Sequence, residues 1–142
     1  MPTSPQPKSP LPKSPQPKSD IDGSERDGVN LAVVRGTISS PPDVRILPSE
    51  AVLAQLQVST RLDTETLSLP VAVWNPAAWV QELETGDAVI VVGRVRRRFF
   101  RAGGAAASRV EVEADVVARA HDRRRVQRAL RHVNEALAVL DG

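Results

Sequence analysis

The residues of this chain best suited to bind a charged ligand lie in the segment 93–101, Gly-Arg-Val-Arg-Arg-Arg-Phe-Phe-Arg. Alternate side chains of a β-strand share a face. A strand here would present on one face Arg94, Arg96, Arg98 and Phe100. Guanidinium groups can follow a phosphate backbone, and an aromatic ring can stack on a base. The segment therefore predicts a surface for a single-stranded nucleic acid.

Ion pairing is the alternative explanation for these arginines. Glu111 and Glu113 lie on the segment expected to pair with them, where they could form a ladder of salt bridges. Two acids would cover at most two of the five arginines in 94–101, so positive charge would remain. Phe100 could instead pack at the rim of a core, and Phe99, on the opposite face, is expected inside the core.

Two tryptophans and two further arginines complete the candidates. Trp74 ends an apolar segment, and its ring could pack under the next element or face a base. Trp79 is expected to pack. Arg45 and Arg61 flank predicted turns and are candidate phosphate contacts.

Charge is unevenly distributed along the chain, although the formal net charge is only +2. Residues 29–120 contain ten arginines and ten acidic residues, with the positive charge concentrated in 94–101. Such local segregation indicates a polyanionic partner more clearly than the net charge does.

Several function classes are excluded by the residue types. The chain has no cysteine, and its two histidines, His121 and His132, have no acidic cluster beside them. We therefore expect no metal and no cofactor. No catalytic set or phosphate-cradling glycine loop is visible, so we expect a binding protein with no catalytic residues, no enzymatic activity and no small-molecule substrate.

No apolar run is long enough for a membrane span, and the N-terminus lacks the apolar core of a signal peptide. We expect a cytoplasmic, nucleoid-associated protein that does not bind membranes.

Residues 1–28 differ in composition from the rest. The pentad Ser-Pro-X-Pro-Lys occurs three times, seven prolines fall in the first nineteen residues, and an acidic linker follows. Proline at this density excludes helices and sheet ladders, so we expect a disordered, extended tail. A solubilising role is favoured over lysine contacts with nucleic acid.

The β pattern begins at Asn30. Five segments have the alternation or apolar character of strands, namely 30–39, 50–61, 67–74, 88–100 and 108–119. Asn75 and Pro76 predict the N-cap and first residue of a short helix over 77–84. Five strands with a helix between the third and fourth are the order of an OB-fold barrel. The sequence therefore predicts an all-β OB-fold domain over 29–120.

A basic C-terminal helix is predicted over residues 121–142. Its apolar residues are spaced four and three apart, as in a coiled-coil seam: Val126, Leu130, Val133, Leu137 and Leu140. The seam could pack on the barrel or on another subunit. Its arginines are expected to be a solvated face, with phosphate contacts as the alternative.

Five segments, in order, resemble the bacterial single-stranded DNA-binding proteins. They are Val33 to Arg45, Pro48 to Leu56, Val71 to Leu83, Gly86 to Val95, and Glu111 to Val117. The resemblance implies sequence-independent binding of single-stranded DNA in replication, repair or recombination. It also implies a homo-oligomer, a tetramer or a dimer, and places Phe100 and Trp74 at aromatic positions of the family.

Two departures from the family are clear. The turn Thr60 to Glu65 is short and carries no ring, and a basic helix replaces the family's glycine-rich, acidic C-terminal tail. The resemblance is thus to a divergent paralogue, of the actinobacterial type. The alternative function is a protein-interaction module that bridges other proteins and has lost most nucleic-acid binding. Scarce aromatics and the heptad helix favour this alternative. The three arginines on one strand face, Arg94, Arg96 and Arg98, which we call the arginine stripe, oppose it.

Overall fold

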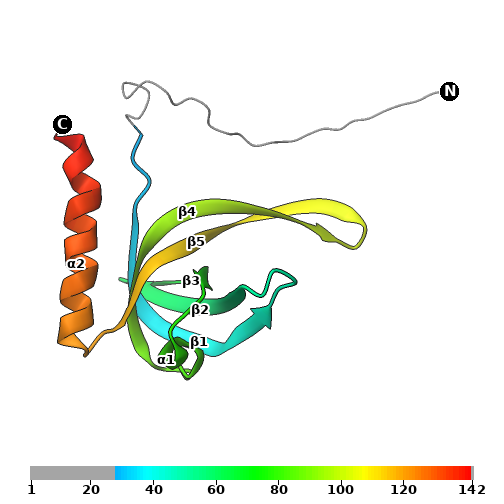
Figure 1. The fold of residues 1–142 in the computed structure, drawn as a ribbon, viewed down its shortest axis with the longest axis horizontal. Helices are drawn as coiled ribbons and strands as arrows, with labels where there is room; N and C mark the ends of the chain where they lie inside the picture. Colours follow the sequence, from blue (N-terminus) through cyan, green and yellow to red (C-terminus); the bar gives the residue numbers. More distant parts are fainter. Residues whose placement is uncertain (1–27, 142) are drawn as a thin grey trace.

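The computed structural model describes residues 28–141. Figure 1 shows a barrel, a helix standing beside it, and a long hairpin that extends past the barrel. The predicted disordered tail and linker, residues 1–28, lies outside the described part of the chain except for Gly28.

Five strands form the barrel and confirm the predicted OB-fold. They are β1 (Ala32–Ile46), β2 (Val52–Leu62), β3 (Glu65–Trp74), β4 (Ala88–Ala102) and β5 (Ala105–Arg119). The order around the barrel is β1-β2-β3-β5-β4, and β4 closes it by pairing with β1. All pairs are antiparallel except β3 with β5. β1 is longer than predicted because register shifts after Ile38 let it continue through two prolines.

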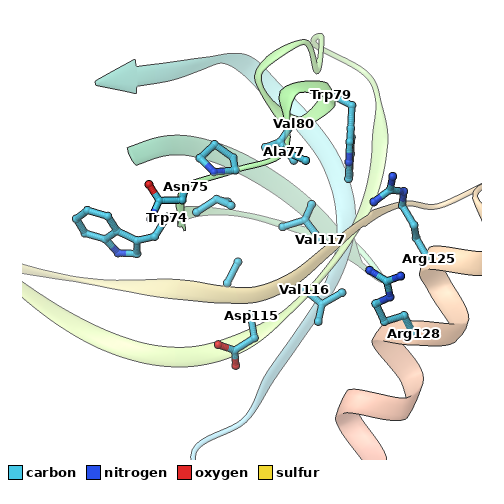
Figure 2. Close-up of a pocket in the computed structure, with 13 residues that line it drawn as sticks. Trp74, Asn75, Ala77, Trp79, Val80, Asp115, Val116, Val117, Arg125 and Arg128 are labelled. Carbon is cyan, nitrogen blue, oxygen red and sulfur yellow. The ribbon is translucent and has the colours of Figure 1, made fainter. Parts of the chain in front are cut away.

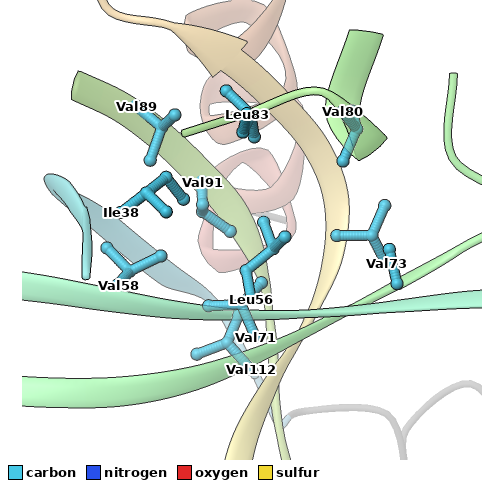
Figure 3. Close-up of a cluster of buried hydrophobic side chains, with 11 residues drawn as sticks. Ile38, Leu56, Val58, Val71, Val73, Val80, Leu83, Val89, Val91 and Val112 are labelled. Atoms are coloured by element: carbon cyan, nitrogen blue, oxygen red, sulfur yellow. The ribbon is translucent and has the colours of Figure 1, made fainter. Parts of the chain in front are cut away.

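The core is aliphatic because the strands supply mainly valine and leucine. Its fully buried side chains come from β1, β2, β3 and β4 and include Ile38, Leu56, Val58, Val71, Val89 and Val91 (Figure 3). Val80 and Leu83 from the segment after β3 enter the same cluster. Each such side chain stabilises the fold by about 1.5–3 kcal/mol relative to exposure.

The short helix after β3, α1 (Ala78–Gln81), is shorter than the predicted 77–84, and its predicted N-cap is wrong. Asn75 has a left-handed backbone (φ 47°), and its Oδ1 accepts a hydrogen bond from the Val52 N–H at 3.0 Å. The side chain therefore fastens the end of β3 to the start of β2 instead of capping α1.

Asp87 fastens the segment between α1 and β4. Its Oδ2 accepts from the Glu84 N–H at 2.8 Å and pairs with Arg119 Nη1 at 3.2 Å. The backbone hydrogen bond from Glu84, with help from Arg119, holds the pKa of Asp87 below its ordinary value of 3.8.

A bulge interrupts the pairing of β4 with β5. Val92 pairs with Val116 and Gly93 with Ala114, so Asp115 has no partner on β4. Because of this extra residue, Val112 and Ala114 before the bulge and Val117 after it all contact the core. Gly93 is required here, since an added Cβ would meet the backbone carbonyl oxygen of Glu113.

The predicted C-terminal helix is present as α2 (Arg123–Leu137), continued by the 3₁₀ turn η2 (Ala138–Leu140). Asp122 caps it by accepting from the Arg125 N–H at 3.2 Å, and this bond lowers the pKa of Asp122. α2 packs on β4 and β5 with Ala129 fully buried. Within residues 28–141, no helix is long and apolar enough to cross a membrane.

The predicted apolar seam lies only partly against the barrel. Val126 and Val133 are half-buried. Leu130, Leu137 and Leu140 remain 46%, 40% and 63% exposed. The outer edge of the seam is therefore open to a further partner.

Candidate nucleic-acid interface

The hairpin of β4 and β5 projects beyond the barrel. β4 pairs with β1 only through residues 88–93, and β5 pairs with β3 only at Val112 and Glu113. Residues 97–110, which we call the arm, pair only with each other (Figure 1). Side chains on both faces of the arm are thus exposed to solvent.

The predicted arginine stripe is paired with acids. Arg94 lies 3.3 Å from Asp115 and 3.6 Å from Glu113. Arg96 Nη1 lies 2.9 Å from Glu113 Oε1. With Arg98 bound to Glu111, all three stripe arginines have carboxylate partners. The expectation that acids cover at most two of the five arginines is wrong, because Glu113 pairs with both Arg94 and Arg96 and Asp115 at the bulge also reaches Arg94.

Glu111 is the buried member of this ladder, with an exposed fraction of 3%. Its Oε2 contacts Arg98 Nε at 3.1 Å, whereas Oε1 has no hydrogen-bond partner among the described residues. Arg98 itself keeps only 34% of its side-chain exposure. Since a buried carboxylate needs a counterion, this pair contributes to the fold as well as to the surface.

The opposite face of β4 carries charge that the ladder does not neutralise. Arg97 donates to Ser108 Oγ and Arg101 to the Gly104 carbonyl, and neither has a carboxylate within 4 Å in the described part of the chain. Phe99 between them is 74% exposed, so its predicted place in the core is wrong. Alternate side chains of β4 face the core within the barrel. The barrel interior ends before the arm begins, so the side chains that continue this alternation in the arm are exposed. Residues 97, 99 and 101 were the signal that sequence reasoning missed.

Phe100 lies on the stripe side of the arm, outside the core cluster, and is 41% exposed. The guanidinium of Arg109, across the hairpin, sits 5.9 Å from the ring centre. The ring is therefore accessible and has a cation beside it, an arrangement that suits base stacking next to a phosphate.

Trp74 is brought beside the stripe. It is 38% exposed and forms one wall of a cleft of about 270 Å³. The remaining lining residues are Arg96, Arg97, Arg98, Glu111 and Glu113. We call this space the arm cleft. The cleft thus brings Trp74 of β3 beside residues of the β4–β5 hairpin, where Arg96 and Arg98 lie with Glu111 and Glu113.

The other candidates are arranged differently. Trp79 packs against the core as predicted, with Arg119 and Arg125 guanidinium carbons 5.4 and 5.0 Å from its ring centre. Arg45 is exposed and pairs with Asp43 at 3.3 Å. Arg61 is exposed near the end of β2. Neither of these two arginines lines the arm cleft.

These features define a closed OB-fold barrel with a cationic, aromatic arm. No family model matches the chain, and no curated protein matches it either. Among solved structures, it is similar to a deletion mutant of the single-stranded DNA binding protein from Thermus aquaticus, with 26% identity and a TM-score of 0.55. The match covers 64% of this chain and 40% of that chain, so this chain spans less than half of its neighbour's length. The barrel is thus an OB-fold of the kind found in that single-stranded DNA binding protein.

Proposed function

We propose that this protein binds single-stranded DNA, without catalysis and with little sequence preference, in DNA replication, repair or recombination. The carrying observation is the convergence of exposed rings and guanidinium groups on the arm and in the arm cleft. Similarity to the Thermus aquaticus protein adds support. The barrel, residues 29–120, is the binding domain in this proposal, and the location is the nucleoid.

In this proposal, arginines contact the phosphates and aromatic rings stack on the bases. Three arginines of the arm, Arg97, Arg101 and Arg109, have no carboxylate partner in the described chain and hold phosphates. Phe99, Phe100 and Trp74 offer faces for bases. Arg94, Arg96 and Arg98 contribute only when a phosphate replaces their carboxylates. Arg45 and Arg61 serve as outlying phosphate contacts.

A titration of labelled oligo-dT at several salt concentrations tests this function. Each neutralised phosphate should contribute about −0.7 to the log–log slope of affinity against salt. Changing Arg97 and Arg101 to glutamine should flatten the slope, whereas the matched pair Arg45 and Arg61 should change it less. Absence of binding even at low salt would reject the proposal and favour the protein-interaction module, which the exposed leucines of α2 also support.

We also propose that the chain forms a homo-oligomer through the open edge of its seam. Leu130→Gln with Leu137→Gln should lower the molar mass measured by light scattering, while thermal stability changes little because both side chains are exposed. The control pair is Leu62→Gln with Leu67→Gln, which are 70% and 55% exposed on the barrel. A monomeric wild-type protein, or equal effects of the two pairs, would contradict this interface.

A further inference from the structure

A second cleft, of about 220 Å³, lies between α1, β5 and α2. Figure 2 shows Trp74 and Asn75 on one side of it, with Arg125 and Arg128 reaching in from α2 on the other. Trp79 from α1 lines the same space. We call this the helix cleft. It is too large for one ordered water and is lined by several hydrogen-bond donors.

Several N–H donors that line the helix cleft have no acceptor among the described residues. Arg128 is exposed and has no carboxylate within 4 Å among residues 28–141. Arg125 binds Asp122 through Nε at 3.0 Å, and its Nη groups have no hydrogen-bond partner in that same range. Trp79 Nε1 is buried and likewise has no acceptor among the described residues. These groups fit an anion.

Acidic groups facing the cleft do not cancel this charge. Asp115 lines it, but its two carboxylate oxygens already contact Arg94 at 3.3 Å and His132 at 3.3 Å. The neighbouring surface of α2 is basic, since Arg124 and Arg131 lie four before and three after Arg128 and share its helical face. Neither forms an ion pair within residues 28–141. The cleft therefore opens onto a positive face.

The two clefts share one residue. Trp74 lines the arm cleft and also the helix cleft, so a chain of nucleotides stacked on this indole is next to both. Phosphates repeat along the strand, and a basic site beside a stacking ring suits the next one.

We propose that the helix cleft binds a phosphodiester of the same single strand after it passes Trp74, so that α2 lengthens the binding path. This inference rests on the proposed function. Arg128 is the principal contact because its guanidinium is unpaired and exposed, and Arg125 assists from its fixed position over Trp79.

Length-dependent binding tests the inference on the full chain. The probes are labelled oligo-dT of about 6 and about 16 nucleotides, which span the site sizes of one OB-fold. Arg128→Gln should weaken binding of the longer probe about fivefold and reduce the salt slope of its log affinity by about 0.7. The affinity for the shorter probe should stay within about twofold of the wild-type value. The matched control is Arg123→Gln, which removes the same charge from α2 about 140° around the helix. It should change the affinity for neither probe.

Fluorescence provides an independent readout. In a Trp74→Phe background, Trp79 is the remaining tryptophan, and its emission should respond to the longer probe but not to the shorter one. If wild-type protein binds neither probe, the proposed function and this inference both fail. If both probes bind but Arg128→Gln behaves like Arg123→Gln, only the inference is overturned.

Discussion

Arg98→Ala should lower the free energy of unfolding by about 2–3 kcal/mol, measured by urea denaturation. The reason lies in Glu111, which is 3% exposed and has Arg98 as its ionic partner at 3.1 Å. Removing the guanidinium leaves a buried carboxylate with no counterion. The expected loss in the free energy of unfolding is smaller than for a fully buried ion pair, because the Arg98 side chain retains 34% exposure.

The control for Arg98→Ala is Arg97→Ala, which removes an exposed guanidinium from the adjacent position and should cost no more than about 0.5 kcal/mol. Combining Arg98→Ala with Glu111→Gln should recover part of the loss, since a neutral amide replaces the stranded charge. Equal losses for Arg97→Ala and Arg98→Ala would show that Glu111 does not depend on its partner. Because Arg98→Ala is expected to be less stable, its measured affinity for DNA must be corrected for the fraction of folded protein.

Glu113→Gln should strengthen binding of single-stranded DNA about fivefold, in contrast to most surface changes. Glu113 Oε1 lies 3.6 Å from Arg94 and 2.9 Å from Arg96, so one carboxylate restrains two guanidinium groups. Neutralising it makes Arg96 available to a phosphate, leaves Arg94 with Asp115 as its one carboxylate partner among the described residues, and removes a repulsive charge. A gain near 1 kcal/mol, typical of an exposed ion pair, corresponds to this factor.

The measurement for Glu113→Gln is fluorescence anisotropy with oligo-dT at fixed salt. Glu82→Gln, an equal charge change beyond the end of α1, is the control and should leave affinity nearly unchanged. Affinity that stays the same or falls in Glu113→Gln would indicate that the carboxylate positions the arginines productively for the strand.

The barrel could be predicted from sequence because its signals are local. Alternation in β2 and β3, and the valine-rich start of β4, reflect which side chains the barrel buries. The helix α2 was likewise evident from its apolar spacing. These patterns depend on a residue's own strand or helix and need no knowledge of its neighbours.

The site was less predictable because it depends on where neighbouring strands end. Phe99 has the parity of a core residue, but no strand covers the arm at that point. Arg94 has two acids nearby in space, Glu113 and Asp115, and the bulge is what brings Asp115 among them. Asn75 has the residue type of a helix cap but binds the Val52 N–H across the sheet. At Asn75 and Arg94 a tertiary contact overrides the local expectation, whereas at Phe99 the covering strand that the expectation assumed is missing.

The bulge at Asp115 also affects how this hairpin should be aligned with other sequences. Without Asp115, β5 would alternate regularly, and Val112, Ala114 and Val117 would still face inward. Deleting Val112 instead would turn Asp115 toward the core if the strand became regular. Asp115 therefore behaves as one inserted residue, and an alignment gap against an unbulged relative belongs at this position. Aligned that way, residues facing the ligand are compared with ligand-facing residues, and core residues with core residues.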